Sequence, residues 1–172
     1  MRLSLLNSSA RICAGLILLL CCSCSSLRAG VQKAYNDNIV GHIANELVGT
    51  RWVPADGARP TVAYSGRYTV LVFFDPDATA TKSCAEELVA LHAEFQDRGV
   101  AFFGVTDCNS EKLGFFLESS PLPFPVLTES PRDRLNFRIK KLYQPEVFVV
   151  DPYQRVAGCG IESTTNLLRQ RL

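Results

Sequence analysis

The sequence predicts one α/β domain with a central mixed sheet, which contains a parallel pair of strands and an antiparallel C-terminal hairpin and is flanked by helices. Residues 68–74 and 100–106 are continuous apolar runs, typical of strands that are buried on both faces. Between them, residues 83–98 carry apolar residues at helical spacing, and a strand–helix–strand unit implies a parallel pair joined by a right-handed crossover. A turn sequence at 151–154 separates two further strand-like runs, which predicts the hairpin.

The first 24 residues, by contrast, have the pattern of a secretory signal. Basic residues without acids come first, residues 12–20 are almost wholly apolar, and small residues and cysteines follow. This apolar run is too short to span a bilayer, which needs about twenty residues. The Ser-Cys-Ser-Ser sequence at its end resembles the lipobox of bacterial lipoproteins, and the resemblance implies lipid attachment to Cys24, with Cys22 and Cys21 as less favoured acceptors. The alternatives are a plain cleaved signal and a short membrane anchor.

Export has consequences for the remaining cysteines. A lipoprotein anchored to a bacterial membrane is expected to face the periplasm, an oxidising compartment in which disulfides persist. Beyond the lipobox the chain contains three cysteines, Cys84, Cys108 and Cys159. An odd number allows at most one intramolecular bridge and leaves one thiol over.

Residues 25–49 are expected to form a short tether and an N-terminal helix. Apolar residues recur at every fourth position with polar residues between them, which is the pattern of one apolar helix stripe, and Gly49 ends it. The stripe comprises Val31, Tyr35, Ile39, Ile43 and Leu47.

The main domain is expected to occupy residues 50–172 and to begin with an edge strand at 52–54. The two buried runs and the helix between them follow. The later elements are then, in order, a helix at 111–118, a proline-rich loop at 121–125, a short helix near 135–139, the hairpin strands at 147–150 and 155–159, and a closing helix up to Leu172.

Charge and histidine content argue against several classes of site. The formal net charge is +1, and no cluster of Lys or Arg suggests a nucleic-acid surface. His42 and His92 lie in predicted helices without a second ligand three or four residues away, whereas a zinc site needs three or four ligands. We therefore expect no nucleic-acid partner, no metal and no cofactor.

Three features together resemble a thioredoxin-like protein: a buried strand that ends in Phe-Phe-Asp-Pro-Asp, a helix with a Cys in its first turn, and a late Tyr-Gln-Pro-Glu-Val-Phe-Val-Val-Asp strand. They are most similar in style to the exported TlpA-like and redoxin group, which includes the AhpC/TSA relatives, over residues 50–160. The resemblance implies a thioredoxin-like fold, thiol chemistry and a protein thiol or disulfide as partner. It also implies that Pro145 is a cis proline that faces the active site and aligns the substrate backbone, although an ordinary proline is tolerated at the first residue of a strand.

Family members that exchange disulfides carry Cys-x-x-Cys where the first buried strand meets its helix, because the helix N-terminus activates the first Cys. This chain has no such pair, and two alignments remain open. In the first, Thr81-Lys82-Ser83-Cys84 takes the place of the motif and resembles the Thr-x-x-Cys pattern of peroxiredoxins, in which the Thr hydroxyl supports a reactive thiolate. This alignment needs an extra residue after Pro76. It also lacks an Arg beside Pro145 or in the 147–150 strand, where peroxiredoxins commonly keep one.

In the second alignment no gap follows Pro76, and Ala78 and Thr81 stand at the two cysteine positions. Eighteen residues lead from Thr81 to Gly99, as is typical of the family, whereas only fifteen lead from Cys84. Cys84 would then lie one helical turn inside, on the same face as Thr81. The helix length favours this alignment, but the sequence leaves both open.

Cys108 follows the second buried run by two residues. Parallel strands end at the same edge of a sheet, where open α/β sheets bind their ligands, so we expect Cys84, Cys108 and Pro145 to cluster there. We hypothesise a reversible Cys84–Cys108 disulfide in place of the missing motif, which requires Cα atoms within about 7 Å. The alternative is that both cysteines are small buried hydrophobes.

Two functions of different classes follow from the resemblance. The first is an exported, membrane-tethered thiol–disulfide oxidoreductase or thiol peroxidase that acts through Cys84, with Thr81 in support, Cys108 as resolving partner and Pro145 aligning the substrate. The second is a redox-inactive thioredoxin-fold lipoprotein that binds a partner. A reactive, partly exposed Cys84 favours the first, and a Cys84 buried on the core face of its helix favours the second.

Overall fold

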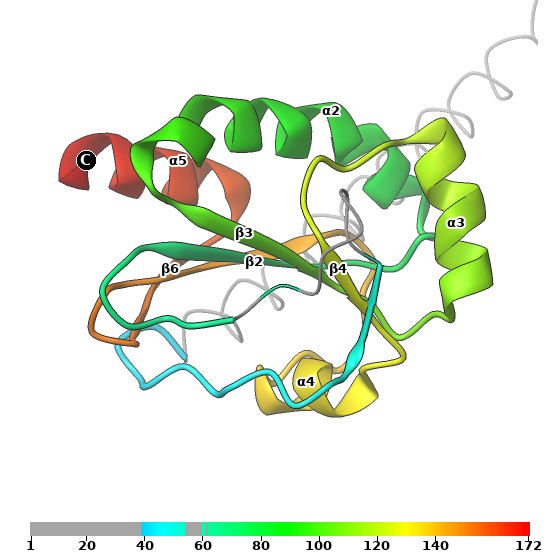
Figure 1. The fold of residues 1–172 in the computed structure, drawn as a ribbon, viewed down its shortest axis with the longest axis horizontal. Coiled ribbons are helices and arrows are strands. Elements are labelled where there is room, and N and C mark those ends of the chain that lie inside the picture. Colours follow the sequence, from blue (N-terminus) through cyan, green and yellow to red (C-terminus); the bar gives the residue numbers. More distant parts are fainter. Residues whose placement is uncertain (1–38, 54–59, 61) are drawn as a thin grey trace, which may run out of the picture. The chain divides into compact units, whose positions relative to one another are not determined.

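The computed structural model describes residues 39–53, 60 and 62–172. The predicted signal, lipobox and tether, with Cys24, therefore lie outside the described residues. In the described part of the chain, no helix is both long enough and apolar enough to cross a membrane. Figure 1 shows this part as a central sheet with helices on both of its faces.

The strands are β1 (Arg51–Val53), β2 (Thr69–Phe73), β3 (Ala101–Val105), β4 (Val126–Thr128), β5 (Glu146–Val150) and β6 (Val156–Cys159). Within the described residues they form one six-stranded sheet in the order β1-β4-β3-β2-β5-β6. β2, β3 and β4 run parallel to one another, whereas β1, β5 and β6 pair antiparallel with their neighbours. The predicted mixed sheet, with a parallel pair at its centre and an antiparallel C-terminal hairpin, is confirmed.

The sequence does not predict β4. Its three residues directly follow the proline-rich loop and are too few to show a period. They become a strand because β3 offers an edge: Gly104 pairs with Val126, and Val105 pairs with Leu127. A Cβ atom on Gly104 would lie only 2.9 Å from the Val126 side chain, so the glycine permits this close pairing.

The helices are α2 (Thr79–Phe95), α3 (Ser110–Ser119), α4 (Pro131–Asn136) and α5 (Ile161–Arg171), with a 3₁₀ helix η1 (Gln96–Arg98) after α2. α2 and α5 cover one face of the sheet, and α4 lies on the other (Figure 1). α2 begins one turn before the predicted start at Ser83. Its end is as predicted, because Gly99 closes η1 with a φ of 78°.

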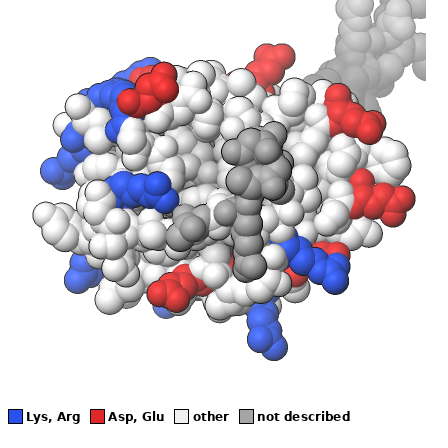
Figure 2. Space-filling model, viewed as in Figure 1, with Lys and Arg blue, Asp and Glu red and all other residues white. Residues whose placement is uncertain are grey.

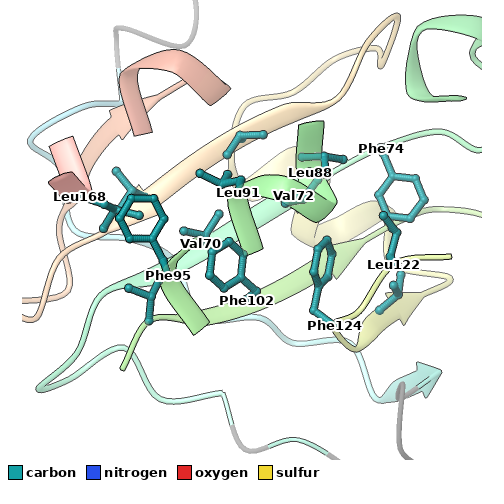
Figure 3. Close-up of a cluster of buried hydrophobic side chains, with 14 of the residues drawn as sticks. Val70, Val72, Phe74, Leu88, Leu91, Phe95, Phe102, Leu122, Phe124 and Leu168 are labelled. Carbon is teal, nitrogen blue, oxygen red and sulfur yellow. The ribbon is translucent and has the colours of Figure 1, made fainter. Parts of the chain in front are cut away.

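Alternate side chains of the central strands point into two cores. On one face, Val70 and Val72 of β2 pack with Leu91 of α2 (Figure 3). On the other face, Phe73 packs against Phe137 with ring centroids 4.9 Å apart. Burying a side chain of this size contributes about 1.5–3 kcal/mol. The sheet is therefore a firm base for the loops at its edges.

Residues 39–49, predicted as the end of the N-terminal helix, are not helical. Gly41 has a φ of 88°, and the segment pairs with the edge of β6 instead. The Gly41 N–H donates to the Val156 carbonyl at 2.7 Å, and the Val156 N–H donates to the His42 carbonyl at 2.9 Å. Ile43, expected on the buried stripe, is 68% exposed. The prediction is wrong because hydrogen bonds to the sheet edge replace helical ones.

One buried carboxylate of α4 fixes the path of the chain into β1. Asp133 accepts the N–H groups of Val48 and Gly49 at 2.8 and 2.9 Å, and the Ser130 hydroxyl also donates to it. A carboxylate is tolerated in a protein interior where its oxygens accept several hydrogen bonds. Asp133 therefore holds residues 48 and 49, which are far from it in the sequence, near the face of the sheet that α4 covers.

Candidate functional site

The strand register brings three loops to one edge of the sheet. Phe73, at the end of β2, pairs with Val105 at the end of β3 and with Glu146 at the start of β5. The segments that follow Phe73 and Val105 and the segment that precedes Glu146 therefore meet at this edge. Cys108 and Pro145 lie in two of these segments, which is the edge where an open α/β sheet binds ligands.

A hollow of about 360 Å³ lies at this edge. Its lining includes the Cys108 thiol, the carboxylates of Asp75 and Asp77, and the cationic groups of Lys112 and Arg134. These side chains come from the loops after β2 and β3, from the first turn of α3 and from α4. The hollow therefore gathers a nucleophile and charges of both signs from distant parts of the sequence. We call it the thiol hollow.

Cys108 is partly buried and directly precedes the N-terminus of α3. Asn109 caps this helix, because its side chain accepts the Lys112 N–H at 2.9 Å. The Cys108 N–H is 3.4 Å from the hydroxyl of Thr106, to which it donates. Burial raises the pKa of Cys108, while the Thr106 hydrogen bond and Lys112 lower it and two nearby aspartates raise it. The balance is a raised pKa, so the thiol is mostly protonated at neutral pH.

Lys112 is shared between the thiol and an acid. It forms an ion pair with Asp77, in the loop between β2 and α2. The hydrogen bond to Asp77 is the main cause that raises the pKa of Lys112, and a Cys108 thiolate would raise it further. The pair joins the start of α3 to the loop that leads into α2. Asp77 thus competes with the Cys108 thiolate for the same cation.

Arg134 fixes two walls of the thiol hollow relative to each other. Its Nε donates to the Asp107 carboxylate at 2.6 Å, and its Nη1 donates to the carbonyls of Ile139 and Lys140, both at 2.7 Å. The wall that contains Asp107 also carries Cys108, and the wall that contains residues 139 and 140 leads into β5. Sequence reasoning missed Arg134 because it looked for an arginine near Pro145. No sequence pattern marks it, since its acidic partner is 27 residues away.

Cys84 lies elsewhere than the sequence predicts. α2 has Ala78 as N-cap and Thr79 as first residue, so Cys84 is in the second turn of the helix and not the first. A helix N-terminus acts only within its first turn. Burial, and then Glu87, raise the pKa of Cys84. Cys84 does not line the thiol hollow, and both it and Cys108 are free thiols.

The helix boundary agrees with the alignment that has no gap. Ala78 is at the N-cap with extended backbone angles, φ −68° and ψ 124°. Thr81 lies in the first turn and is 1% exposed. Its hydroxyl has no hydrogen-bond partner among the described residues, so it makes none to Cys84. The support of a Cys84 thiolate by Thr81, which the other alignment implies, is not observed.

Pro145 is buried and directly precedes β5. No cis peptide bond occurs among the described residues. The expectation of a cis bond before Pro145 is therefore wrong. The proline occupies the ordinary place before the first residue of a strand, where a missing N–H disturbs no ladder.

Within the residues that the structure describes, no group of three or more His, Cys, Asp or Glu side chains is arranged to hold a metal ion. His92 packs instead against Phe102, with ring centroids 5.0 Å apart, and burial lowers its pKa. On the face shown in Figure 2, basic and acidic side chains are interspersed around the rim.

Comparisons with known proteins agree with this architecture. The AhpC/TSA family matches residues 55–158. The thioredoxin domain of a thiol-disulfide oxidoreductase from Bacteroides vulgatus aligns with a TM-score of 0.63 at 17% identity, over 77% of this chain and 96% of that one. A PrxQ mutant from Xylella fastidiosa aligns with a TM-score of 0.58 at 18% identity, over 77% of this chain and 98% of that one. A comparison with curated proteins gives no match.

AhpC from Mycobacterium tuberculosis also aligns, with a TM-score of 0.51 at 16% identity, over 62% of this chain and 73% of that one. Identities this low carry information about the fold alone. The predicted thioredoxin-like fold, shared by thiol-disulfide oxidoreductases and peroxiredoxins, is confirmed.

Proposed function

Because the chain belongs to the AhpC/TSA family, we propose that it is an exported, membrane-tethered thiol oxidoreductase whose working thiol is Cys108. The observation that carries the proposal is the place of Cys108, which lines the thiol hollow at the N-terminus of a ten-residue helix. A helix N-terminus and a nearby cation are the two features that favour a thiolate. Cys84 has neither of them.

The reaction that this place supports is thiol–disulfide exchange. The Cys108 thiolate attacks one sulfur of a partner disulfide, a new sulfur–sulfur bond forms, and the other partner sulfur leaves as a thiolate and takes up a proton. The partner is thereby half reduced and joined to Cys108. A second thiol that attacks the Cys108 sulfur releases the partner in its reduced form and leaves Cys108 in a new disulfide, and a further thiol then returns Cys108 to its thiol form.

The raised pKa of Cys108 affects the rate of this exchange in two opposite ways. Each unit of pKa increase lowers the thiolate fraction about tenfold at neutral pH, while the nucleophilicity of the thiolate rises only about threefold. The net loss is about threefold per unit, which is modest. At pH 7 the exchange is therefore expected to be somewhat slower than with a thiol of ordinary pKa, and its rate should increase with rising pH.

The membrane tether follows from the N-terminal sequence. The short apolar run and the lipobox-like ending support lipid attachment at Cys24, and they support a periplasmic position for the domain. The partner would then be a protein thiol or disulfide in that compartment, where disulfides persist.

One observation favours a second candidate, a redox-inactive domain that binds a partner. Ala78 and Thr81 occupy the N-cap and first turn of α2, where active relatives are expected to carry their two cysteines. Neither residue can exchange a disulfide. A domain that has lost both thiols at this helix could keep the fold for binding alone.

The two candidates are separated by single-cysteine chemistry on the full chain purified from membranes. The protein is reduced, freed of reductant and exposed to glutathione disulfide at pH 8, and the modified cysteine is located by peptide mass spectrometry. We expect one glutathionyl group on Cys108 in the native chain and in Cys84→Ser, and its loss in Cys108→Ser. Preferential modification of Cys84 would contradict our assignment of the thiol. Resistance of every cysteine until the protein unfolds would favour the binding domain.

A further inference from the structure

A second hollow, separate from the thiol hollow, lies beside the edge of β6. It has a volume of about 470 Å³ and lies between the segment 39–45, the residues that follow α4 and the start of β6. Figure 1 shows this segment, in blue and cyan, passing beside the orange β5–β6 hairpin. Its charged lining groups are Arg138 and Arg155, His42 also lines it, and no Asp or Glu does.

We propose that this part of the surface rests on an anionic membrane, with a lipid headgroup phosphate held between Arg138 and Arg155. We call the surface formed by Val40, His42, Ile43, Arg138 and Arg155 the docking face. The proposal rests on the membrane tether of the proposed function and is independent of the thiol chemistry.

The two arginines are the first argument, because they share one hollow and, among the described residues, no carboxylate is paired with either of them. Arg51, Arg134 and Arg169 are each paired with a carboxylate. Arg155 donates to the Gly41 carbonyl at 2.9 Å, and in the part of the chain that the structure describes neither it nor Arg138 forms an ion pair. Two cations in one hollow without an acid suit a phosphate group.

Asp151, four residues before Arg155, is engaged elsewhere. Asp151, in the turn before β6, accepts the backbone N–H groups of Tyr153 and Arg155, both at 2.9 Å, and does not line the hollow. Its oxygens are thus engaged in holding the turn. The hollow keeps a positive lining, which matches an anionic surface in charge.

Exposed apolar side chains beside the hollow are the second argument. Ile43 is 68% exposed and Tyr153 is 83% exposed, and Val40 is also exposed. Aliphatic side chains next to arginines, with an aromatic side chain at the margin, are the composition by which peripheral proteins enter the headgroup region.

The position of the tether is the third argument. The described domain begins at Ile39, which itself lines the hollow, and the proposed lipid acceptor Cys24 is fifteen residues earlier in the sequence. Fifteen residues span at most about 50 Å. The tether keeps the docking face at a high effective concentration near the bilayer, so weak contacts suffice to hold it there.

The two hollows extend from opposite ends of the sheet but share one connection of the chain. Thr69 pairs with Val150 at one end of the central strands, and Phe73 pairs with Glu146 at the other. Arg155 follows the first pair, whereas the thiol hollow lies beyond the second. Arg138 belongs to the connection between α4 and β5, which also contributes Lys140 to the thiol hollow.

Hydrogen exchange of the full lipid-anchored chain in vesicles tests the proposal. The chain is reconstituted into phosphatidylcholine vesicles with and without phosphatidylglycerol, and exchange is followed by mass spectrometry. We expect the amides of residues 40–44 to exchange more slowly in the anionic vesicles than in phosphatidylcholine vesicles. Each Arg near an anionic surface contributes about fivefold to docking. Arg138→Ala with Arg155→Ala should therefore lower the docking constant about 25-fold and remove the protection.

A matched control removes two positive charges from the opposite helical layer, as Lys82→Ala with Arg171→Ala, and should keep the protection. Ile43→Ser, at an exposed position that is safe for folding, should reduce it through the apolar contact. Equal protection in both kinds of vesicle, or its survival in the double arginine variant, would overturn the proposal. Protection of these amides by soluble glycerol phosphate, without vesicles, would also overturn the proposal. It would indicate that the hollow binds a soluble anion and not a membrane. The intact mass reports acylation separately, so failure of the tether is distinguishable from failure of docking.

Discussion

If Ala78 and Thr81 hold the positions of a missing dithiol, two cysteines placed there should form a reactive pair. We therefore consider Ala78→Cys with Thr81→Cys, in a Cys84→Ser background. The matched control is Thr81→Cys alone, which creates a pair with the native Cys84 at the same spacing. Both variants place a Cys at the buried position 81, where a small side chain is tolerated.

The expected difference can be estimated from the helix boundary. Both bridges close a loop of the same length, so the loop-closure contribution of about 2 kcal/mol cancels. Position 78 is the N-cap of α2, whereas position 84 lies in its second turn. A helix N-terminus stabilises a negative charge by about 0.3–2 kcal/mol. At 1.36 kcal/mol per pKa unit, the thiol at 78 should have a pKa roughly 0.2–1.5 units lower and roughly 2 to 30 times more thiolate at neutral pH.

Geometry decides which pair closes to a disulfide, because a stabilised thiolate by itself favours the reduced form. Side chains three apart within a helix have Cβ atoms about 5–6 Å apart, which is too far for a disulfide without distortion. Ala78 has extended backbone angles and can turn towards position 81, whereas Thr81 and Cys84 are both inside the helix. We thus expect the 78/81 pair to form a bridge more readily than the 81/84 pair.

The assay is equilibration of each variant in glutathione redox buffers, followed by alkylation and intact mass. The 78/81 pair should be oxidised under conditions in which the 81/84 pair remains reduced, and it should react faster with glutathione disulfide at pH 7. The reverse order would refute our alignment. It would favour the other alignment, in which Thr81-x-x-Cys84 takes the place of the Cys-x-x-Cys motif.

Three further predictions concern side chains of the site and its support. Lys112→Ala should move the pH profile of Cys108 alkylation to higher pH, because Lys112 lowers the pKa of the thiol, and Asp77→Asn should move it to lower pH, because Asp77 raises it; unchanged profiles would show that these charges do not reach the thiol. Thr81→Val should leave the free energy of unfolding, measured by urea denaturation, unchanged or raise it by up to about 2 kcal/mol, because the buried hydroxyl has no partner in the described part of the chain. A clear decrease would show that this hydroxyl does form a hydrogen bond. Asp133→Ala should destabilise the domain by about 2–4 kcal/mol in the same measurement, since the part-buried N–H groups of Val48 and Gly49 lose their acceptor, and a loss below 1 kcal/mol would contradict the role given to this carboxylate.

The central layer of the fold was predictable because its sequence signals are long and consistent. Residues 69–73 and 101–105 are rich in β-branched and aromatic residues and almost wholly buried, and the helix between them keeps its period over four turns. Two other segments were not predictable in this way. β4 has three residues and exists because β3 pairs with it. Residues 39–49 have a helical period in the sequence, but residues 41–43 pair with the edge of β6 through backbone groups, which any residue type provides. In both places tertiary contacts decide the local structure.

The candidate site was predictable only in part for the same reason. Cys108 could be placed at the correct edge because the rule about parallel strands needs only the strand order. Arg134 could not, since its role depends on how α4 meets the loop after β3. The start of α2 was placed one turn late because Ala78 gives no capping signal. This error made Cys84 look like a thiol of the first turn.

Two helices begin at the sheet edge that holds the thiol hollow, and the hollow has only one thiol among its lining residues. α2 and α3 both begin at this edge because each follows one of two parallel strands. The helix that usually activates the nucleophile starts at Ala78 and carries no thiol in its first turn, whereas the other starts directly after Cys108. With Cys84 outside the hollow, an internal thiol cannot resolve a mixed disulfide at Cys108 without a rearrangement of the chain. Release of glutathione from a mixed disulfide at Cys108 should therefore be first order in an added external thiol, and decay at the same rate without that thiol would mean that another thiol of the chain reaches the hollow after all.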